Sequence, residues 1–569
     1  MSIIISKTRI IGTTPTPVQT WDRPSDWLDM PALSQGDEKI YFLVKVFEDG
    51  ENFHRFKITG DYTVDWGDGT ANTNHSSNTT AEHEFAWGDA SPSSLTSHGF
   101  RQVIVTVTPQ SGSTLTGITR QSSPYYATGD TARGGNNSVI SIKMAGTGFT
   151  TLHQAFYNYT VLEEFEYVGT TPNLVTASQV FSQCYQLKKV IQWNIANVTT
   201  LSSCFNACYQ LITLPQLDTS SCTNFASTFI NCSSIDYIPT IDVSSSTSLS
   251  STFNGCFSLK NNPISDYTGI TNFTGAFKGT GIKVFEAVLP NATNLYTMFQ
   301  NCANLEIASL TIPNGQLTNI GYLFSSCNQI KEIKPFDTSA VTEFRYAFAT
   351  NRYVRDYGWL DTSSGQNFTG MFSGNYLTDA SFIDISSATV VSNLFSDCIK
   401  LTKLPTSFDC TNLTSISGMF KGCGMLNAPP NLTNTGNITN TTLAFYYCRN
   451  LKQAPPISGT IANAQQMFQN CRSLEKIPAY DLSGCNSGNE TYLFANSCYN
   501  LRESLVTGNT SKINYSSCAL SESKIEEIFN GLGTVSSATV INVSNCPGSA
   551  GLTTAQEDIA INKGWTVTN

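Results

Sequence analysis

The sequence predicts a mainly β protein dominated by a solenoid of about fifteen coils. Three observations predict it: apolar residues that recur with a period of about 24, a charged fraction of only 13%, and short apolar runs separated by Ser, Thr, Asn and Gly. Globular proteins carry about 25% charged residues, so neutral polar side chains must form most of this surface. At 569 residues the chain exceeds one ordinary core, and a repeat array accounts for that length.

Phenylalanine marks each repeat, at intervals of about 24 residues. The anchors are Phe156, Phe181, Phe205, Phe229, Phe253, Phe277, Phe299, Phe324, Phe348, Phe372, Phe395, Phe420, Phe445, Phe468 and Phe494. In most repeats a Cys follows three residues after the Phe and a Leu or Ile six after it, as in Phe205, Cys208 and Leu211. One coil cannot bury its own apolar face, so successive coils stack and share an interior. With strands about 4.8 Å apart, fifteen coils span roughly 70 Å.

The Phe and Cys positions are therefore expected to form a structural ladder inside the solenoid. Its members include Phe181, Cys184, Phe205, Cys208, Phe229, Cys232, Phe299, Cys302, Phe324, Cys327, Phe468 and Cys471. Free cysteine is a small buried hydrophobe with a weak donor, which suits a position that touches backbone carbonyl groups. We favour reduced thiols, because parallel side chains do not point at one another. Disulfides stay open as an alternative, and zinc would need Cys-x-x-Cys pairs that the sequence lacks.

The string aliphatic-x-x-x-Phe-x-x-Cys-x-x-Leu-x-x-Leu/Ile-Pro resembles the BspA-type leucine-rich repeats of bacterial surface proteins, over residues 150–505. This resemblance implies a right-handed solenoid used for adhesion and not for catalysis. We place the leucine-rich-repeat solenoid at 150–520 and a C-terminal α/β cap at 521–569, because the open end of a stack must be covered. The cap is predicted to contain a helix ending at Gly531, a strand at 540–543 and a second helix at 553–563.

Upstream of the repeats, strand alternation around an Asp-Gly turn predicts an all-β module at 36–110. Its VDWGDGT string, followed by His-x-Phe and VIVTVT, resembles a PKD-type immunoglobulin-like β-sandwich, which implies a spacer. Residues 1–35 are expected to form a docking arm, and residues 111–149, rich in Gly, Ser and Thr, a linker or an irregular first coil. The anchors of the docking arm are expected to be Trp21, Arg23, Trp27 and Leu28.

Carboxylates recur after the expected strands of the repeats, at Asp218, Asp242, Asp337, Asp361, Asp409 and Asp481. A row of carboxylates could supply the acid and the nucleophile of a glycosidase. Capping of the turn after each strand explains the recurrence better, since the motif appears in many coils. Asp61, Asp65 and Asp68 could hold calcium, although their turn needs no metal. No cofactor and no metal site is predicted.

In two successive coils, one segment has Arg, Tyr and Trp where other coils have Ser and Asn. This candidate recognition patch consists of Arg345, Tyr346, Arg352, Tyr353, Arg355, Tyr357 and Trp359. These residue types are enriched in binding hot spots, and aromatic platforms also stack on sugar rings. Tyr446 and Tyr447 with Arg449 form a smaller group of the same residue types. The alternative is that the aromatics pack loops and the charges keep the surface soluble.

The composition disfavours several classes of function. A net charge of −10 and a pI near 5.1 disfavour nucleic-acid binding, and no apolar run approaches the ~18 residues of a membrane span. The N-terminus lacks the apolar core of a signal peptide, and histidine occurs only up to His153, which removes most imidazole-based catalysis from the repeats. A chain of this kind is expected to be made in a host cytoplasm and to reach the outside on a particle.

The arm, the PKD-like module, the repeats and the Lys-Gly-Trp-Thr-Val end together resemble structural proteins of phages that infect marine cyanobacteria. The resemblance implies a non-enzymatic virion surface protein, a fibre or a capsid or tail decoration subunit. Its N-terminus would bind other virion proteins, and its solenoid would bind a glycan or protein of the host surface. A polysaccharide-degrading tailspike and a bacterial cell-surface adhesin are the alternatives. Homo-oligomerisation is left open.

Overall fold

The computed structural model describes residues 20–50, 52–120, 138–313, 315–485 and 494–569. The chain divides into two compact units. The first consists of the residues up to 224 with 228–242 and 256–265, and the second of 225–227, 243–255 and 266–569. The first nineteen residues of the expected docking arm and residues 121–137 of the expected linker lie outside the described residues.

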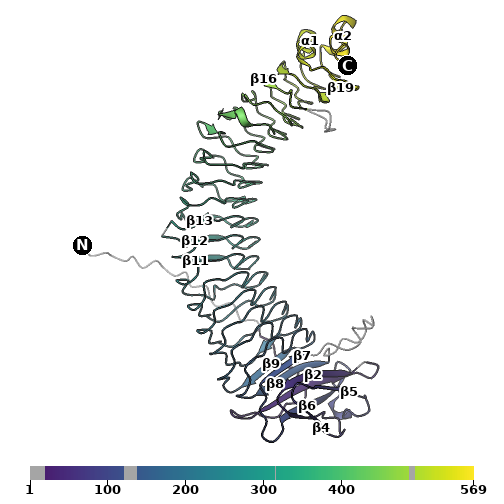
Figure 1. The fold of residues 1–569 in the computed structure, drawn as a ribbon, viewed down its shortest axis with the longest axis vertical. Helices are drawn as coiled ribbons and strands as arrows, with labels where there is room; N and C mark the ends of the chain where they lie inside the picture. Colours follow the sequence, from purple (N-terminus) through teal and green to yellow (C-terminus); the bar gives the residue numbers. More distant parts are fainter. Residues whose placement is uncertain (1–19, 51, 121–137, 314, 486–493) are drawn as a thin grey trace, which may run out of the picture. The chain divides into compact units, whose positions relative to one another are not determined.

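The first unit begins with two packed sheets (Figure 1). Its strands are β1 (Lys39–Val46), β2 (Phe53–Thr59), β3 (Tyr62–Asp65), β4 (Thr73–His75), β5 (Thr80–Glu84), β6 (Arg101–Pro109), β7 (Gly117–Arg120), β8 (Val139–Ala145), β9 (Glu164–Val168) and β10 (Lys189–Val190), with a 3-10 turn at Pro92–Ser94. The order is β10-β9-β8-β1-β6-β3-β4 in one sheet and β5-β2-β7 in the other. Phe42 and Phe56, from different sheets, pack with ring centroids 5.2 Å apart. The two sheets thus share a core, and the finer PKD-type likeness stays a prediction.

The larger sheet continues into the repeats without a break. Strand β8 pairs antiparallel with β1, with Ile40 opposite Met144, and parallel with β9, with Ile142 opposite Phe165. Strand β7 joins the smaller sheet through β2. Of the two alternatives for residues 111–149, the linker was therefore wrong for the described part of that segment, whereas the parallel pairing of β8 with β9 agrees with an irregular first coil. The segment contains β7 and β8, although a composition rich in Gly, Ser and Thr is typical of loops. Nearly all side chains of β8 are buried, so its sequence lacks the alternation that would predict a strand.

Short parallel strands continue through the second unit. They are β11 (Val284–Val288), β12 (Ile307–Thr311), β13 (Glu332–Ile333), β14 (Phe408–Asp409), β15 (Leu432–Thr433), β16 (Lys476–Asp481), β17 (Glu503–Thr507), β18 (Ile513–Asn514), β19 (Thr539–Asn542) and β20 (Trp565–Thr568), with 3-10 turns at Thr435–Asn437 and Ser549–Gly551. Strands from successive coils pair in parallel, for example Phe285 opposite Ala308. The predicted mainly β solenoid of many coils is confirmed.

The Phe side of each coil is built from tight turns and not from a helix. Thr297 and Asn301 have φ of 54° and 63°, the left-handed region in which small and Asn-like residues are tolerated. The N–H groups of Thr297, Phe299 and Asn301 donate to carbonyl oxygens of the next coil over 2.9–3.0 Å, while that of Gln300 closes a turn to Thr297. Alternate amides thus join neighbouring coils, and those between them hold each coil closed.

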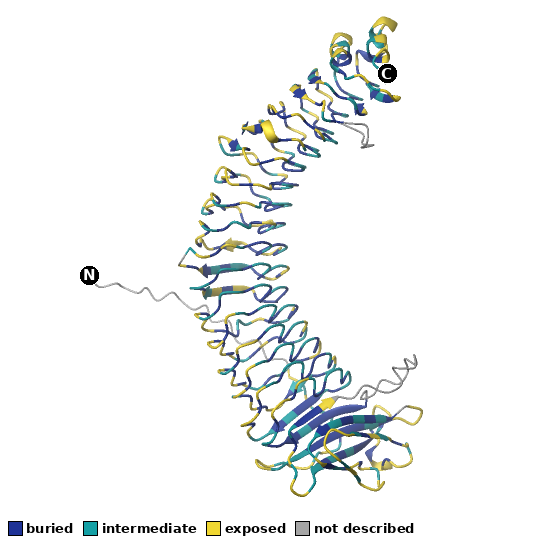
Figure 2. Ribbon diagram, in the orientation of Figure 1, coloured by how far each residue is buried: buried dark blue, intermediate teal, exposed yellow. Residues whose placement is uncertain are grey.

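The predicted ladder lies in the interior of the solenoid (Figure 2). Its twelve representative Phe and Cys residues are each at most 1% exposed. Phe299 and Phe324 stack with centroids 5.6 Å apart and an interplanar angle of 4°. The thiol of Cys327 donates to the carbonyl oxygen of Phe299 over 3.0 Å, and the bond recurs from Cys208 to Phe181 at 3.1 Å. All seventeen cysteines are buried free thiols, which agrees with the reduced alternative.

Two coils show what the ladder position requires. Asn375 stands where most coils have Cys, and its side-chain amide donates to the carbonyl oxygen of Phe348 over 3.0 Å, the same bond that the thiols make. In the coil of Phe494 the position belongs to Cys498, which donates to the carbonyl oxygen of Phe468 over 3.0 Å. Counting three residues from Phe494 would place Ser497 there. Ala495 and not Phe494 occupies the Phe position of this coil, since its carbonyl oxygen accepts the thiol of Cys518 over 3.0 Å as the ladder Phe does elsewhere.

Two helices cover the C-terminal end of the second unit. Helix α1 (Glu522–Gly531) buries Ile525, Ile528 and Phe529, and α2 (Thr554–Ile561) begins with a capping box between Thr553 and Gln556. Both predicted helices and the last strands are confirmed. Neither helix is long or apolar enough to cross a membrane, and the other described residues offer no such helix.

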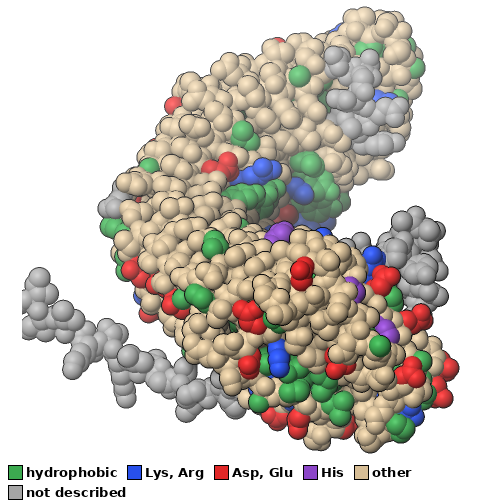
Figure 3. Space-filling model, turned by 60° about the horizontal axis from the view of Figure 1, so that its bottom comes forward, with side chains coloured by type: hydrophobic (Ala, Val, Ile, Leu, Met, Phe, Trp, Pro, Cys, Tyr) green, Lys and Arg blue, Asp and Glu red, His purple; other side chains and the backbone are tan. Residues whose placement is uncertain are grey.

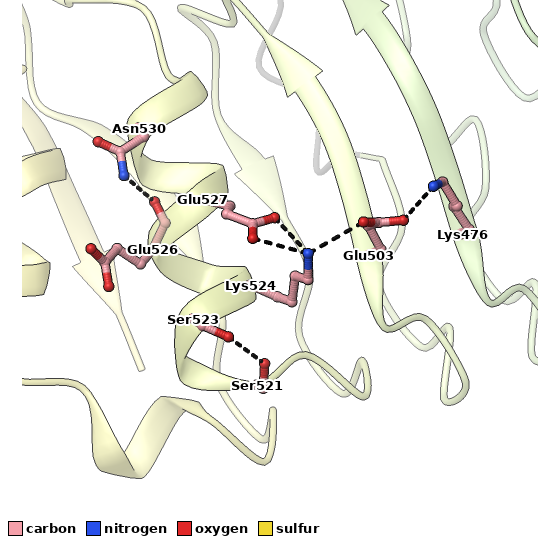
Figure 4. Close-up of polar contacts among 8 residues, drawn as sticks. All are labelled: Lys476, Glu503, Ser521, Ser523, Lys524, Glu526, Glu527 and Asn530. Atoms are coloured by element: carbon pink, nitrogen blue, oxygen red, sulfur yellow. Dashed lines mark hydrogen bonds and ion pairs between the residues drawn. The ribbon is translucent and has the colours of Figure 1, made fainter.

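An ion-pair network ties the cap to the last coils (Figure 4). Glu503 on β17 lies between Lys476 on β16 at 2.6 Å and Lys524 on α1 at 3.2 Å. Lys524 also pairs with Glu527 on its own helix at 2.8 Å. The network joins β16, β17 and α1, so it links the cap to the last coils.

Candidate functional site

The repeated carboxylates cap turns. Oδ1 of Asp361 accepts the N–H of Ser363 over 3.0 Å and its hydroxyl over 2.7 Å. The same motif occurs at Asp218, Asp337, Asp409 and Asp481. Because the hydroxyl and the N–H of Ser363 donate to it, the pKa of Asp361 lies below its ordinary value. A glycosidase acid needs the opposite shift, so this row has the chemistry of turn caps.

The anchors of the expected docking arm pack on the chain's own first unit. Trp27 is buried and meets Trp21 edge-on, with ring centroids 6.0 Å apart. The guanidinium of Arg23 pairs with Glu164 at 3.0 Å and donates to the carbonyl oxygen of Leu28 over 2.6 Å. These four residues therefore hold the segment onto the sandwich, and their role in docking stays a prediction.

The aspartates of the Asp-Gly turn do not converge on one point. Asp61 accepts the N–H of Ser77 over 2.7 Å, and Asp65 caps its own turn. Asp68 binds His83 over 2.6 Å. Within the described ranges no three His, Cys, Asp or Glu side chains gather in a way that could hold a metal ion.

The residues of the candidate recognition patch divide into three groups. Arg345 is exposed, and the ring of Tyr346 stacks on Tyr322 with centroids 5.0 Å apart. Arg352, Tyr353 and Arg355 are exposed and follow the anchor Phe348 by four to seven residues. Trp359 is half-buried and packs against Phe336, with ring centroids 4.9 Å apart. The patch is therefore not one continuous surface.

Tyr357 is 1% exposed, so its assignment to the patch was wrong. Its ring packs between Phe348 and Phe372, with centroids 5.1 and 5.0 Å away, and its hydroxyl accepts from Asn375 over 2.9 Å. Tyr357 follows its anchor Phe by nine residues, the spacing at which other coils carry an inward aliphatic residue. That spacing was the signal that could have identified Tyr357 as a core residue.

Three cations surround the ring of Tyr376 on the coil that follows. The charged groups of Arg352, Arg355 and Lys400 lie 5.7, 6.0 and 5.0 Å from its centroid. Arg355 also donates to the carbonyl oxygen of Tyr376 over 2.9 Å. An aromatic face attracts a cation through its quadrupole, so one tyrosine here holds two cations from the preceding coil and one from the following coil.

Tyr376 belongs to a surface row that we call the arginine–tyrosine column. The column contains ten of the residues that stand one or two places after the ladder position in seven successive coils: Arg352, Tyr353, Tyr376, Ile399, Lys400, Gly424, Met425, Arg449, Arg472 and Tyr499. Tyr353, Met425 and Tyr499 are each at least half exposed. Six steps of about 4.8 Å give it a length of roughly 30 Å. Hydrophobic and basic side chains gather in one area of a mostly uncharged surface in the space-filling view (Figure 3).

A hollow of about 680 Å³ opens in the middle of the column. Gly422 and Gly424 stand where the preceding coil has Asp397 and Ile399, and where the following coil has Tyr447 and Arg449. The coil between them thus lacks two side chains on this face. The hollow is lined by Ile399, Lys421, Met425, Tyr446, Tyr447 and Arg449, with Asp397 also present. The sequence pointed to Tyr446, Tyr447 and Arg449 but not to the glycines that expose them.

Several cations on the strand side of the coils have carboxylate partners, whereas the arginines of the column have none in the part of the chain that the structure describes. On the strand side, lysines pair with carboxylates of the neighbouring coil, as Lys331 does with Glu306 at 2.6 Å and Lys403 with Asp379 at 3.3 Å. Among the described residues, Arg352, Arg449 and Arg472 have no carboxylate within ion-pair distance. The last two lie over Tyr447 and Tyr499, 5.5 and 5.8 Å from the centroids. The column therefore carries uncompensated positive charge.

Comparison with known proteins places the repeats in a family. The family model described as "Mycoplasma protein of unknown function, DUF285" matches residues 150–267, 175–291, 293–377, 361–460 and 389–505. No curated protein matches the chain. A solved leucine-rich repeat protein from Bacteroides ovatus is 15% identical, with a TM-score of 0.42, over 72% of this chain and 91% of that one. An internalin from Listeria monocytogenes is 12% identical, with a TM-score of 0.17, over 75% and 86%. These structural likenesses are too low to carry an argument about function.

Proposed function

Because this chain belongs to the DUF285 family of repeat proteins, we propose that it is a non-enzymatic surface protein whose solenoid adheres to another surface. A leucine-rich-repeat-type solenoid fits that role, since its coils offer a long, regular face for contact. The observation that carries the proposal is the arginine–tyrosine column. It gathers exposed aromatic rings and uncompensated cations, the side chains enriched in binding hot spots.

Adhesion through such a row needs no single strong contact. Each cation over an aromatic ring contributes about 0.5–1 kcal/mol at an exposed site, and simultaneous contacts along a polymer or a cell surface add avidity. The seven coils of the column would then act together.

The finer proposal concerns where the protein resides. We propose a virion surface role, as a fibre or decoration subunit of a phage. It is supported by the resemblance of the assembled sequence features to phage structural proteins and by the low charged fraction of 13%. Particles purified from infected cells and probed with antibodies against this chain test it directly. Labelling on particles supports the virion role, whereas labelling on uninfected bacterial cells would support the alternative of a cell-surface adhesin.

Docking through the N-terminus is best tested with a deletion that does not also disturb the fold, as removal of residues 1–35 would. Arg23 and Trp27 hold the segment onto the first unit, so their loss would also disturb the fold. Deleting residues 1–19 leaves those contacts in place. If the N-terminus docks on the particle, this truncation folds but is absent from particles; normal incorporation would refute docking through those residues.

Adhesion is tested with fluorescently labelled full-length protein on intact bacterial cells. Wild type is expected to bind, and the double variant Tyr353→Ser with Tyr499→Ser is expected to bind less, because both rings lie exposed in the column. The matched control is Tyr237→Ser, which removes a ring of similar exposure on the strand side. Equal binding by all three proteins would contradict recognition through the column.

A further inference from the structure

We propose that the hollow at Gly422 and Gly424, with the column on either side of it, binds an acidic polysaccharide, a polymer of uronic-acid type. This inference rests on the proposed adhesive function and names its ligand class. The three features that carry it are the charge of the column, the shape of the hollow and the regular spacing of the coils.

The positive charge of the column and the hollow favours an anionic ligand. The whole chain has a net charge of −10, yet the described part of the column lacks ion-paired arginines, and Lys421 and Arg449 face the hollow. A guanidinium binds a carboxylate through two parallel hydrogen bonds, so Arg449 is the group that would pair with a uronate. Its guanidinium lies over the ring of Tyr447 in the lining of the hollow, and no carboxylate of the described residues is within ion-pair distance of it.

The chemistry of the hollow favours a sugar. The rings of Tyr446 and Tyr447 lie 4.5 Å apart at an angle of 58°, so they offer two differently oriented faces beside an open space. Ile399 and Met425 add apolar surface to the lining of the hollow. Oδ2 of Asp397 accepts the hydroxyl of Ser396 over 2.9 Å, and no side chain or N–H of the described residues donates to its Oδ1, which can therefore accept a hydroxyl group of a ligand. Rings that bear hydroxyls and one carboxylate match this mixture.

Nucleic acid, the other flexible polyanion with flat rings, fits less well. Its phosphates need several clustered cations, and binding falls steeply with salt. Here Asp397 lies in the hollow, and the chain as a whole repels a dense polyanion. A uronate polymer carries its charge more sparsely, one carboxylate for each sugar, and so meets less of that repulsion.

The length of the site points to a polymer. Column residues recur in every coil from Arg352 to Tyr499, over roughly 30 Å. The backbone amides of the turns are engaged by neighbouring coils, as those of Thr297 and Phe299 illustrate, so an added peptide strand finds few free partners there. Side-chain contacts to an extended glycan remain as the mode of binding.

The experiment uses the full chain and two forms of one polymer. Polygalacturonate and its methyl ester share their sugars, but the ester lacks the charge. Biolayer interferometry at low and physiological salt is expected to show binding of polygalacturonate and at least about tenfold weaker binding of the ester, equivalent to about 1.4 kcal/mol. A single-stranded oligothymidylate serves as the nucleic-acid probe. Equal binding of the ester, or tighter binding of the oligonucleotide, would overturn the proposal.

Two variants locate the site. Gly424→Trp fills the hollow without a change of charge, and a Cβ there meets only the carbonyl oxygen of Gly422, at 4.0 Å. Arg449→Gln with Arg472→Gln removes two cations and stays informative if the tryptophan variant fails to fold. Each is expected to weaken binding of polygalacturonate at least about tenfold. Lys403→Gln, on the strand side, is the control and is expected to bind like wild type.

The outcomes separate the two proposals. Binding to intact cells without binding to polygalacturonate leaves the adhesive function standing and refutes the ligand class. Absence of both refutes both. Binding of polygalacturonate that neither variant weakens would refute the site.

Discussion

The thiol of Cys327 donates a hydrogen bond to the carbonyl oxygen of Phe299 in the preceding coil, over 3.0 Å. This contact recurs through the solenoid and joins the two residues that define the repeat. It adds a second hydrogen bond to a carbonyl group that also accepts the N–H of Cys302 over 3.1 Å and is buried among stacked rings, where polar atoms need partners. The Phe gives the interior its volume, and the Cys completes its hydrogen bonding.

Cys327→Ala is expected to lower the free energy of unfolding by about 1–2 kcal/mol, because it removes one of the two hydrogen bonds to a buried carbonyl and leaves a small cavity. Urea unfolding followed by circular dichroism measures the change. Asn328→Ala, an exposed neighbour, is the control and is expected to change stability by less than about 0.5 kcal/mol. Equal effects of the two substitutions would show that the thiol contact does not stabilise the coil.

High pH is expected to destabilise the solenoid through its thiols. Burial raises the pKa of Cys302 from 9.0 to about 11, and that of Cys222 likewise. Thiols of the unfolded chain ionise near pH 8.5, at which the folded chain keeps its protons. Unfolding thus releases protons, so the stabilisation is complete below about pH 8.5 and is lost as pH rises toward 11. Urea midpoints between pH 7 and 10.5 test this, and a constant midpoint would contradict it.

Low pH is expected to destabilise the first unit through His54. This side chain is fully buried between Phe42 and Phe56, and burial lowers its pKa from 6.5 to about 3. The unfolded chain takes up a proton below pH 6.5 and the folded chain does not, so stability is full above pH 6.5 and falls as pH drops toward 3. Each unit of pKa difference corresponds to about 1.4 kcal/mol.

His54→Phe is expected to reduce this acid sensitivity, whereas His98→Phe, at an exposed position, keeps it. Tryptophan fluorescence reports the transition, because Trp66 packs in the same core as Phe56. Thermal unfolding at pH 7 and pH 4.5 is the comparison. If the His54 variant loses as much stability at pH 4.5 as wild type does, the buried histidine is not the cause.

Arg23 is expected to stabilise the first unit through its ion pair. Its partner Glu164 is only 5% exposed, so Arg23→Met leaves a nearly buried carboxylate that keeps only the hydroxyl of Ser141. A loss of about 1–3 kcal/mol is expected, less than for a fully buried pair because Arg23 itself is partly exposed. Glu82→Gln, which breaks an ion pair whose carboxylate is half exposed, is the control. Similar melting temperatures for wild type and Arg23→Met would contradict the role.

The sequence predicted the solenoid because its repeating residues report directly on burial. Every coil must fill the same interior, so Phe and Cys recur at fixed spacing, and the helical cap shows the usual helix signals. Cys498 escaped prediction because Ala495, and not Phe494, stands at the Phe position of its coil. Strands β7 and β8 escaped because pairing with β1 and β2 stabilises them, a long-range contact that composition does not record.

The candidate site was predicted less completely. Arg352, Tyr353 and Arg449 were found because binding residues differ in type from the Ser and Asn around them. Tyr357 was misplaced, since the charged string around it outweighed its core spacing. The hollow was missed because it arises from side chains that Gly422 and Gly424 lack, and its neighbours belong to three coils.

Hydroxyl-radical footprinting of the full chain, with and without polygalacturonate, tests the central claim most directly. Tyr353, Met425 and Tyr499 are each at least half exposed and lie on the column, while Tyr237 has similar exposure on the strand side. If the column is the recognition surface, oxidation of the first three side chains slows when the polymer is bound, and oxidation of Tyr237 does not change. Protection of Tyr237 instead, or unchanged oxidation of all three column residues under bound polymer, would contradict the account.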